Sequence, residues 1–380
     1  MAKSKAAKSP AWKVNPMPGA NEYVNSVSIS ADGTKVLGGT YYFNYEGAGH
    51  APATTPQITV GVFAWNNSGL LLWKAEFSAT EGIYWVALSG DGSYAASGGL
   101  LAHGKGLVYV YNASGKNVLS YNPPARTNMV ALDQKGDYLV AGADALYLFK
   151  RTGTTWNNTP QIIQSPVSGD TVISVGISAD GQWIVAGTYN GVVMLVKNTN
   201  GVPGQPVTWQ LQNGKINWIA IAAGGTGFAA AGSDAKVYFF NVANFPASKK
   251  PAWSAALTGC SNCRSVAVTS DGSLISAVAN DASAGQLFLL ANNGTTSKQL
   301  WAKPTLHSPN STSIDAAGKY VTAADGYPDG KPGSFSLYAT DGTQQWNYPT
   351  SNMSWPMMIS ANASGIAAGS DDSDIYYFTV

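Results

Sequence analysis

A short pattern recurs along this chain of 380 residues. Each copy holds a strand of alternating apolar and polar residues, a tight turn at a glycine, and a second strand that ends in small residues. Two clear copies are VSISADGTKVLGG from Val27 and VGISADGQWIVAG from Val175. The glycines that mark the copies are Gly33, Gly92, Gly136, Gly181, Gly225, Gly272, Gly318 and Gly365. The first step between these glycines is 59 residues, and the other six are 44–47 residues. A period of about 45 residues indicates a repeat architecture, in which each unit buries its apolar face against its neighbours.

The second half of each unit contains a third strand, a turn rich in Gly and Asn, and a fourth strand, as in SFSLYATDGTQQWNYP from Ser334. Most fourth strands carry a tryptophan: Trp73, Trp209, Trp253, Trp301 and Trp346. Four strands in about 45 residues is the content of one blade of a β-propeller.

The last unit lacks a fourth strand, because only DIYYFTV follows its marker. The segment SPAWKVNP near the N-terminus, with Trp12, matches the missing strand. We therefore predict an all-β fold, an eight-bladed β-propeller of four-stranded antiparallel blades, in which residues 10–16 close blade eight beside the C-terminal strand. Residues 1–380 then form a single domain, with residues 1–9 flexible.

Charge and hydropathy limit the partners of this chain. Charged residues make up 11% of it and the formal net charge is +1, which weighs against nucleic acid as a partner. No apolar stretch approaches the ~20 residues that a membrane-spanning helix needs. The low charge, the many Asn, Ser, Thr and Tyr residues and the close pair Cys260 and Cys263 favour a secreted or periplasmic protein. Because MAKSKAAKSP has no apolar signal-peptide core, this setting implies a signal peptide that was removed.

Two segments carry a family resemblance. LYATDGTQQW (Leu337–Trp346) and AWNNSGLLLW (Ala64–Trp73) each have a third strand, a turn with Asp or Asn and Gly, and then tryptophan. At these residues the chain resembles the quinoprotein-like propellers, the pyrroloquinoline-quinone (PQQ) repeat superfamily, and the resemblance extends over essentially the whole chain. It implies a tryptophan that docks between adjacent blades. That superfamily contains oxidoreductases and also cofactor-free scaffold lipoproteins. The Asp-Gly turn with its Ala-Ala-Gly ending is similar, in addition, to the first half of a WD40 repeat.

The residue eight positions before each marker glycine is expected at the mouth of the central channel. These residues are Asn25, Tyr84, Asn128, Ile173, Asn217, Arg264, Asn310 and Met357. The polar members predict a ligand-binding site, because amides that converge on one axis can hold a sugar, a peptide or an ion: Asn25, Tyr84, Asn128, Asn217, Arg264 and Asn310. Trp85 and Trp218, in the adjacent register, fit either packing between blades or stacking on a ligand.

The connections on the face of the channel mouth carry most of the length variation. Tyr41–Gln57 is the longest insertion, and Leu100–Gly106 and Asp325–Gly333 are shorter ones. Because variable loops on a rigid scaffold often carry binding residues, we expect a protein or surface-glycan partner on this face. Solvated loops without a ligand are the alternative. The sequence does not indicate an oligomeric state.

No catalytic constellation stands out. Three histidines, His50, His103 and His307, cannot supply the cluster of a copper enzyme. Cys260 and Cys263 in CSNC predict a local disulfide, with free thiols or a metal-linked pair as the alternative. Ser370–Asp374 (SDDSD) fits either a calcium site or a solvated loop.

Two functions follow from these observations. The first is a non-enzymatic scaffold or recognition module that binds through its variable-loop face and needs no cofactor. The alternative is a quinoprotein-type oxidoreductase that binds PQQ and calcium at the channel mouth. The cations and carboxylates available for such a site are scattered over different blades: Lys105, Arg126, Arg264, Glu22, Glu81 and Asp170. The adjacent cysteine pair of alcohol-oxidising members is absent, which argues against a dehydrogenase.

Overall fold

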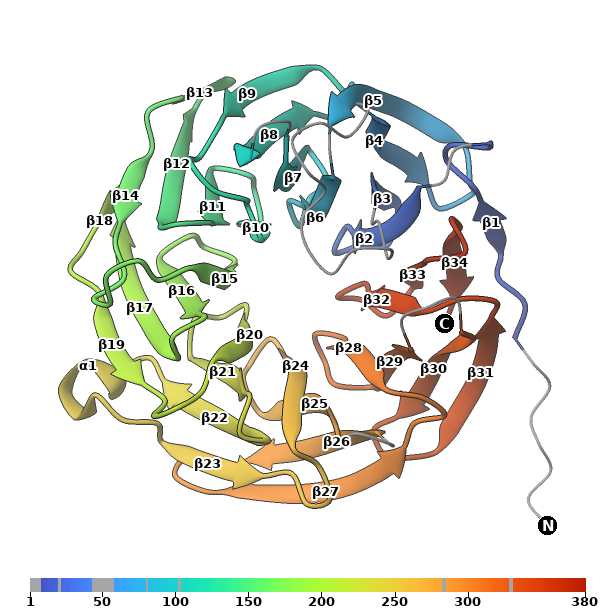
Figure 1. The fold of residues 1–380 in the computed structure, drawn as a ribbon. Helices are drawn as coiled ribbons and strands as arrows, with labels where there is room; N and C mark the ends of the chain where they lie inside the picture. The colour runs from blue at the N-terminus through green and yellow to red at the C-terminus, as the bar shows by residue number, and fades with distance from the viewer. Residues whose placement is uncertain are drawn as a thin grey trace, which may run out of the picture.

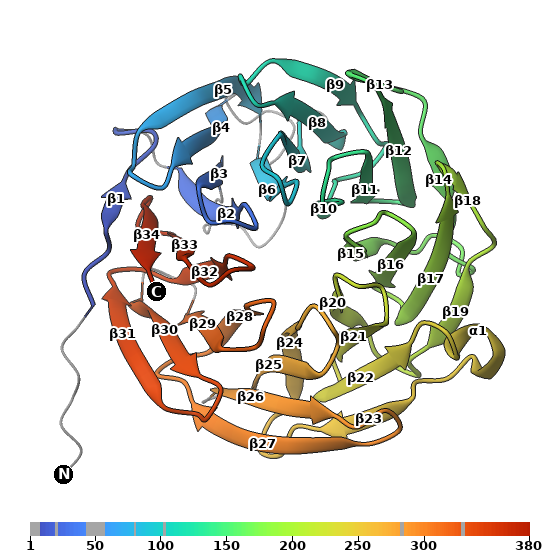
Figure 2. The ribbon, with the colours of Figure 1, turned by 180° about the vertical axis from the view of Figure 1, so that it is seen from behind.

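The strands of the protein form twisted sheets that stand around a central axis (Figure 1). This computed structural model describes residues 8–19, 22–42, 58–79, 81–101, 104–281, 285–327 and 331–380. The ring of sheets is equally plain from behind (Figure 2). The arrangement is a β-propeller, as the sequence period predicts.

The innermost strands line the axis, and a second strand pairs with each of them. The innermost strands are β2 (Tyr23–Ile29), β6 (Gly82–Leu88), β10 (Met129–Leu132), β15 (Val172–Ile177), β20 (Ile216–Ile221), β24 (Asn262–Val268), β28 (Pro309–Ile314) and β32 (Ser354–Ile359). The second strands are β3 (Lys35–Tyr41), β7 (Tyr94–Leu100), β11 (Tyr138–Gly142), β16 (Trp183–Thr188), β21 (Gly227–Gly232), β25 (Leu274–Asn280), β29 (Tyr320–Gly326) and β33 (Gly365–Ser370).

The third and outer strands continue each sheet away from the axis. The third strands are β4 (Ile58–Asn66), β8 (Gly106–Asn112), β12 (Leu146–Thr152), β17 (Val192–Thr199), β22 (Lys236–Asn241), β26 (Gly285–Asn292), β30 (Gly333–Ala339) and β34 (Ile375–Thr379). The outer strands are β5 (Leu71–Ala79), β9 (Asn117–Tyr121), β13 (Thr155–Trp156), β14 (Gln161–Ile163), β18 (Val202–Pro203), β19 (Val207–Gln210), β23 (Trp253–Ala256), β27 (Ser297–Pro304), β31 (Gln344–Thr350) and β1 (Trp12–Val14). A four-residue helix, α1 (Phe245–Ser248), precedes β23.

Hydrogen bonding groups the described strands into seven antiparallel sheets. Four sheets have four strands, two have five because their outer strand is split into two short pieces, and one has eight. The eight-stranded sheet arises because one residue pair, Tyr41 with Gly82, joins β3 to β6. The propeller has seven blades if this sheet is counted as one blade, and eight blades if it is counted as two.

The marker turns have a common hydrogen-bonded form. At the first turn Gly33 has φ 73°, its N–H donates to the carbonyl of Ser30 at 2.9 Å, and the Ser30 hydroxyl donates to Asp32 at 2.6 Å. Glycine suits this position because a positive φ is costly for residues with a Cβ.

In the last unit the marker assigned from sequence is wrong. Gly365 begins β33, and the residue with positive φ is Ala363, at 57°. Its N–H donates to the carbonyl of Ser360 at 2.9 Å, as at the other turns. The sequence pattern marks each turn by a glycine, so this turn, which has an alanine in the left-handed conformation, was assigned to the wrong residue.

The small residues that end each second strand are required by contact between neighbouring sheets. A Cβ on Gly187 would lie 2.5 Å from Cγ2 of Ile216, on the next innermost strand. The same contact closes the ring, because a Cβ on Gly369 in β33 would lie 2.6 Å from Cγ1 of Val24 in β2. Near the axis the sheets therefore approach too closely for larger side chains.

The N-terminal segment completes the last sheet, as predicted. β1 pairs antiparallel with β34, with Trp12 opposite Tyr377 and Val14 opposite Ile375. The strand covers residues 12–14 rather than 10–16. Of the segment expected to be flexible, residues 1–7 lie outside the described residues.

Tryptophans of outer strands dock on the next sheet, as the family resemblance implies. Trp12 Nε1 donates to the Asn67 carbonyl at 3.1 Å, and Trp301 Nε1 donates to the Thr340 carbonyl at 2.7 Å. The ring of Trp73 covers Gly115, where a Cβ would lie 2.6 Å away. Each such tryptophan covers the turn between the third and outer strands of its neighbour.

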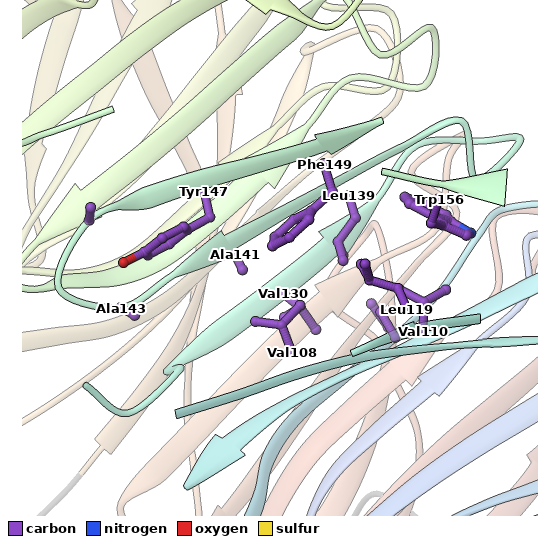
Figure 3. Packing of buried hydrophobic residues seen from close by; sticks show 13 residues of the cluster. Val108, Val110, Leu119, Val130, Leu139, Ala141, Ala143, Tyr147, Phe149 and Trp156 are labelled. Carbon is purple, nitrogen blue, oxygen red and sulfur yellow. The ribbon is translucent and has the colours of Figure 1, made fainter. Parts of the chain in front are cut away.

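The hydrophobic core is divided among the spaces between sheets. In one of these clusters Val108, Val110 and Leu119 of one sheet face Val130 and Phe149 of the next (Figure 3). This is the burial between neighbouring units that the repeat predicts, and it explains how the chain exceeds the usual size of a single central core.

Candidate ligand pocket at the channel mouth

The residues predicted at the channel mouth stand at irregularities of the innermost strands. Pairing of β2 with β3 skips Asn25, and the corresponding pairings skip Tyr84, Asn217, Arg264 and Asn310. A β-bulge of this kind leaves one residue out of the ladder and redirects its side chain. Asn128 stands immediately before β10.

These side chains meet in one pocket of about 320 Å³. All six residues predicted from the sequence line it: Asn25, Tyr84, Asn128, Asn217, Arg264 and Asn310. Ile173 lines it too, whereas Met357 is fully buried and does not. The volume is within the range of small-molecule and peptide-anchor sites, about 300–1,000 Å³.

The pocket has further lining residues that the sequence analysis missed. Lys215 and Asn262 stand two residues before predicted rim residues, ten before their marker glycines. Trp355 stands eight residues before Ala363, so it takes the place assigned to Met357 once the turn is located correctly. The serine before the Ala363 turn, Ser360, matches Ser30 of the first turn and could have located it.

The asparagine amides at the rim tie neighbouring sheets together. Asn128 Nδ2 donates to the Val172 carbonyl at 3.0 Å, and Asn310 Nδ2 donates to the Ser354 carbonyl at 2.8 Å. Asn217 Nδ2 donates to the Cys263 carbonyl at 2.6 Å. Asn25 Nδ2 makes a longer bond of 3.3 Å with the Tyr84 carbonyl. The amides thus have a structural role, which sequence alone did not distinguish from ligand binding.

Two tryptophans pack against each other within the pocket lining. Trp85 of β6 and Trp218 of β20 have ring centroids 5.0 Å apart, with planes at 73°. These strands belong to sheets on different sides of the axis (Figure 1). Of the two roles considered for these tryptophans, packing between blades and stacking on a ligand, the contact favours packing, because each ring already has the other as its aromatic neighbour.

Three cations surround the mouth. Arg264 and Lys215 line the pocket, and Arg126 stacks on the ring of Tyr84 at 4.5 Å, donating to Asn128 Oδ1 at 2.8 Å. Burial lowers the pKa of Arg264 from its usual value, and the nearest hydrogen-bond partner is Asn310 Oδ1 at 3.4 Å.

The carboxylates proposed for a quinone site are not in the pocket lining. Glu81 accepts a short hydrogen bond from the Tyr84 hydroxyl, and Asp170 accepts the Ser165 hydroxyl at 2.8 Å and the Thr171 N–H at 2.8 Å. Glu22 is buried, which raises its pKa. A cofactor with carboxylates would meet cations here, but the lining offers no carboxylate ligand for calcium, so the fit to quinone with calcium is incomplete.

The carboxylates of Ser370–Asp374 have separate partners. Asp371 accepts Trp355 Nε1 at 2.8 Å, Asp372 accepts the Tyr376 hydroxyl at 2.5 Å, and Asp374 forms an ion pair with Lys13 at 2.5 Å. Within the described ranges no group of three or more His, Cys, Asp or Glu residues could hold a metal ion.

The predicted disulfide is not formed. Cys260 and Cys263 are free thiols, and Cys263 is fully buried in an apolar cluster between sheets. Burial raises the pKa of Cys263. The cysteine lies in β24, so its side chain serves core packing.

Parts of the variable loops lie outside the described residues. These parts are residues 43–57, with His50, residues 102–103, with His103, and residues 328–330.

Comparison with known proteins gives matches in structure alone. No protein-family model matches the chain, and no curated protein matches its sequence. Sqt1 of Chaetomium thermophilum, bound to the N-terminus of the ribosomal protein L10, matches with a TM-score of 0.73 at 13% identity, covering 98% of this chain and 100% of that one. Sqt1 of the same organism in a second structure gives 0.72 at 13% identity, with 98% of each chain covered.

The β-propeller domain of Cps50 (Swd1) from Myceliophteria thermophila matches with a TM-score of 0.58 at 12% identity, covering 78% of this chain and 96% of that one. These neighbours are WD40 propellers. At this identity the matches show the fold of this chain, a β-propeller. Of the two resemblances drawn from sequence, the matches support the WD40-like one.

The secreted or periplasmic setting predicted from composition is wrong. The structural neighbours of this chain are intracellular proteins, and the Sqt1 structure holds the N-terminus of a ribosomal protein. Uncharged hydroxyls and amides make turn and sheet-to-sheet hydrogen bonds, as at Ser30 and Asn128. In the described part of the chain no helix is long and apolar enough to cross a membrane.

Proposed function

We propose that this protein is a non-enzymatic recognition module that holds a protein partner at its channel-mouth face, with the pocket as the anchor point. The observation that carries the proposal is that six residues selected by sequence position, each from a different repeat, line one pocket of about 320 Å³. A surface glycan is the second class of ligand that amides and tryptophans could hold.

The proposal includes a count of eight blades. We count the eight-stranded sheet as two blades, because its halves each repeat the four-strand unit and one residue pair joins them. On this count the rim has eight positions, and a ligand on the axis can contact several blades at once. The match to Sqt1 with a bound ribosomal protein segment is consistent with a peptide-binding propeller.

The test is affinity capture from native extract, with bound proteins quantified for the wild type, for Arg264→Gln and for Lys215→Gln. We expect specific partners to be lost in both variants. Lys116→Gln is the matched control, because Lys116 is an exposed cation in a turn between third and outer strands, away from the mouth. Equal capture by all four proteins would contradict a site at the channel mouth.

Asn217→Ala is a poorer probe, since it also removes a tie between sheets, the 2.6 Å bond to the Cys263 carbonyl. Each variant is therefore checked first for an unchanged melting temperature. A loss of capture without a loss of stability then reports on the surface and not on folding.

The alternative function, a quinoprotein-type oxidoreductase, has one observation in its favour. Arg264 and Lys215 could face two carboxylates of PQQ. Adding PQQ with calcium should then raise the melting temperature, because a ligand stabilises the state that binds it, and dye-linked alcohol or sugar oxidation should appear. An unchanged melting temperature and no oxidation would remove this alternative.

A further inference from the structure

The pocket lining combines positive charge with an absence of acidic side chains. Arg264 and Lys215 are its charged members, and every other lining residue is uncharged. The chain as a whole has a formal net charge of only +1, so this local excess is not a consequence of overall basicity. A concave site with one sign of charge attracts ligands of the opposite sign.

Arg264 has most of its hydrogen-bonding capacity unused. A guanidinium has five N–H donors, and in the described residues Arg264 makes one long hydrogen bond, 3.4 Å to Asn310 Oδ1. The side chain is half-buried, and this burial lowers its pKa. Holding a poorly solvated cation without a counter-ion costs free energy, and a bound anion would offset that cost.

The cations of the pocket have no carboxylate beside them in its lining. Asp371 accepts Trp355 Nε1, and Glu81 accepts the Tyr84 hydroxyl. No ion pair joins Arg264 or Lys215 to a carboxylate within the described ranges. The pocket therefore presents its cations to whatever enters it.

Additional donors stand beside the cations. Asn262 accepts a hydrogen bond from Asn217 through Oδ1 at 2.7 Å, which leaves its amide N–H groups as donors. Lys215 lies within 5.5 Å of the Tyr189 ring, and Tyr189 is 60% exposed. A carboxylate in the pocket could thus accept charge-assisted hydrogen bonds from Arg264 and from Lys215.

We propose that the channel-mouth pocket binds a carboxylate carried by an acidic segment of a protein partner, with Arg264 and Lys215 as the recognition residues. This inference rests on the proposed recognition function and names its ligand chemistry. A planar guanidinium matches a carboxylate in bidentate geometry, and the pocket volume of about 320 Å³ accommodates one acidic side chain with its flanking backbone.

The first experiment is an unbiased selection. A random peptide library displayed on phage is selected on the wild-type protein, on Arg264→Gln and on Arg264→Glu. We expect enrichment of Asp and Glu on the wild type, loss of that enrichment on Arg264→Gln, and enrichment of Lys and Arg on Arg264→Glu. Lys116→Gln should select the same peptides as the wild type.

The second experiment uses defined probes. Fluorescent peptides carrying a selected acidic motif, its Glu→Gln version and its Glu→phosphoserine version are titrated with the protein. Loss of a charge-assisted contact should weaken binding about tenfold or more, both for the Gln peptide and for Arg264→Gln. Binding of the acidic peptide should also fall as salt is raised, because the contact is electrostatic.

The outcomes separate this inference from the proposed function. Selected peptides without acidic residues, or equal affinity of the Glu and Gln peptides, would overturn the carboxylate ligand and leave the recognition function standing. Much tighter binding of the phosphoserine version would reassign the site to phosphoryl groups. A library that yields no peptide dependent on Arg264 or Lys215 would count against the recognition function itself.

Discussion

Trp12 at the closure of the ring provides the sharpest test of the architecture. It is the outer-strand tryptophan of the last sheet, and it lies on the N-terminal segment, so nothing covalent holds it next to β34. Its ring stacks on Tyr377 with centroids 5.5 Å apart and planes at 8°, and Nε1 donates to the Asn67 carbonyl at 3.1 Å. Trp12→Ala removes both contacts and leaves the backbone of β1 in place.

The expected loss follows from these contacts. An aromatic pair contributes about 0.5–1.5 kcal/mol and a hydrogen bond about 0.5–1.5 kcal/mol. Burial of roughly 100 Å² of this half-buried ring adds about 2.5 kcal/mol. Because these terms overlap, we expect Trp12→Ala to lower the free energy of unfolding by about 3 kcal/mol, and Trp12→Phe, which retains stacking, by about 1 kcal/mol.

The assay is urea denaturation followed by far-UV circular dichroism, with amide hydrogen exchange at Ile375–Thr379 to detect local opening of the closure. Trp73→Ala is the matched comparison, since Trp73 makes the same kind of contact over Gly115 within the continuous chain. Leu72→Ala, at a side chain 43% exposed, should change stability by under about 0.5 kcal/mol. A Trp12→Ala protein as stable as this control, with unchanged exchange in β34, would refute the closing role of the N-terminal strand.

Three further predictions concern the repeat itself. Ala363→Gly should raise the free energy of unfolding by about 0.5–1 kcal/mol, measured in urea, because the residue has φ 57°; a loss of stability would contradict a strained turn. Burial raises the pKa of Asp133 to about 6, so the unfolded chain loses this proton at lower pH than the folded protein, and stability falls as pH rises from about 4 to 6. Asp133→Ser supplies the hydroxyl that Ser178 has at the same position of its repeat. The substitution should flatten this decline and raise the free energy of unfolding at pH 7 by about 1–2 kcal/mol after allowance for solvent screening. An unchanged slope of stability against pH between 4 and 6 would contradict this prediction. Gly187→Val should lower stability by more than about 3 kcal/mol because its Cβ would overlap Ile216, and a melting temperature within two or three degrees of wild type would show that the sheets can separate.

The positions of the rim residues could be predicted because they are set by counting along a repeat. Asn217 and Arg264 stand eight residues before their turn glycines, and the strand between rim and turn has a constant length. The method failed once, in the last unit, where Ala363 takes the role of glycine and the rim residue is Trp355 instead of Met357. Counting back from a turn glycine locates the rim residue only where the turn has a glycine.

The contacts that these side chains make could not be predicted from the sequence. The sequence could not show that Asn128 donates to Val172 of another sheet, or that Trp85 and Trp218 meet across the channel. It paired Cys260 with Cys263 because they are close in sequence, whereas strand β24 directs Cys263 into the packing between sheets. These contacts join residues separated by tens to more than a hundred positions, so spacing carries no information about them.

Taken by itself, the amino-acid sequence determined the repeat, the four-strand unit, the tight turns and the N-terminal strand that completes the ring. These depend on alternation, on positive φ and on apolar period, all of which act between residues close along the chain. Only the tertiary structure decided that Lys215 and Arg264 converge without a paired carboxylate, and so decided the charge of the pocket. That charge is a sum over side chains from separate blades, and their distances exist only once the ring has closed.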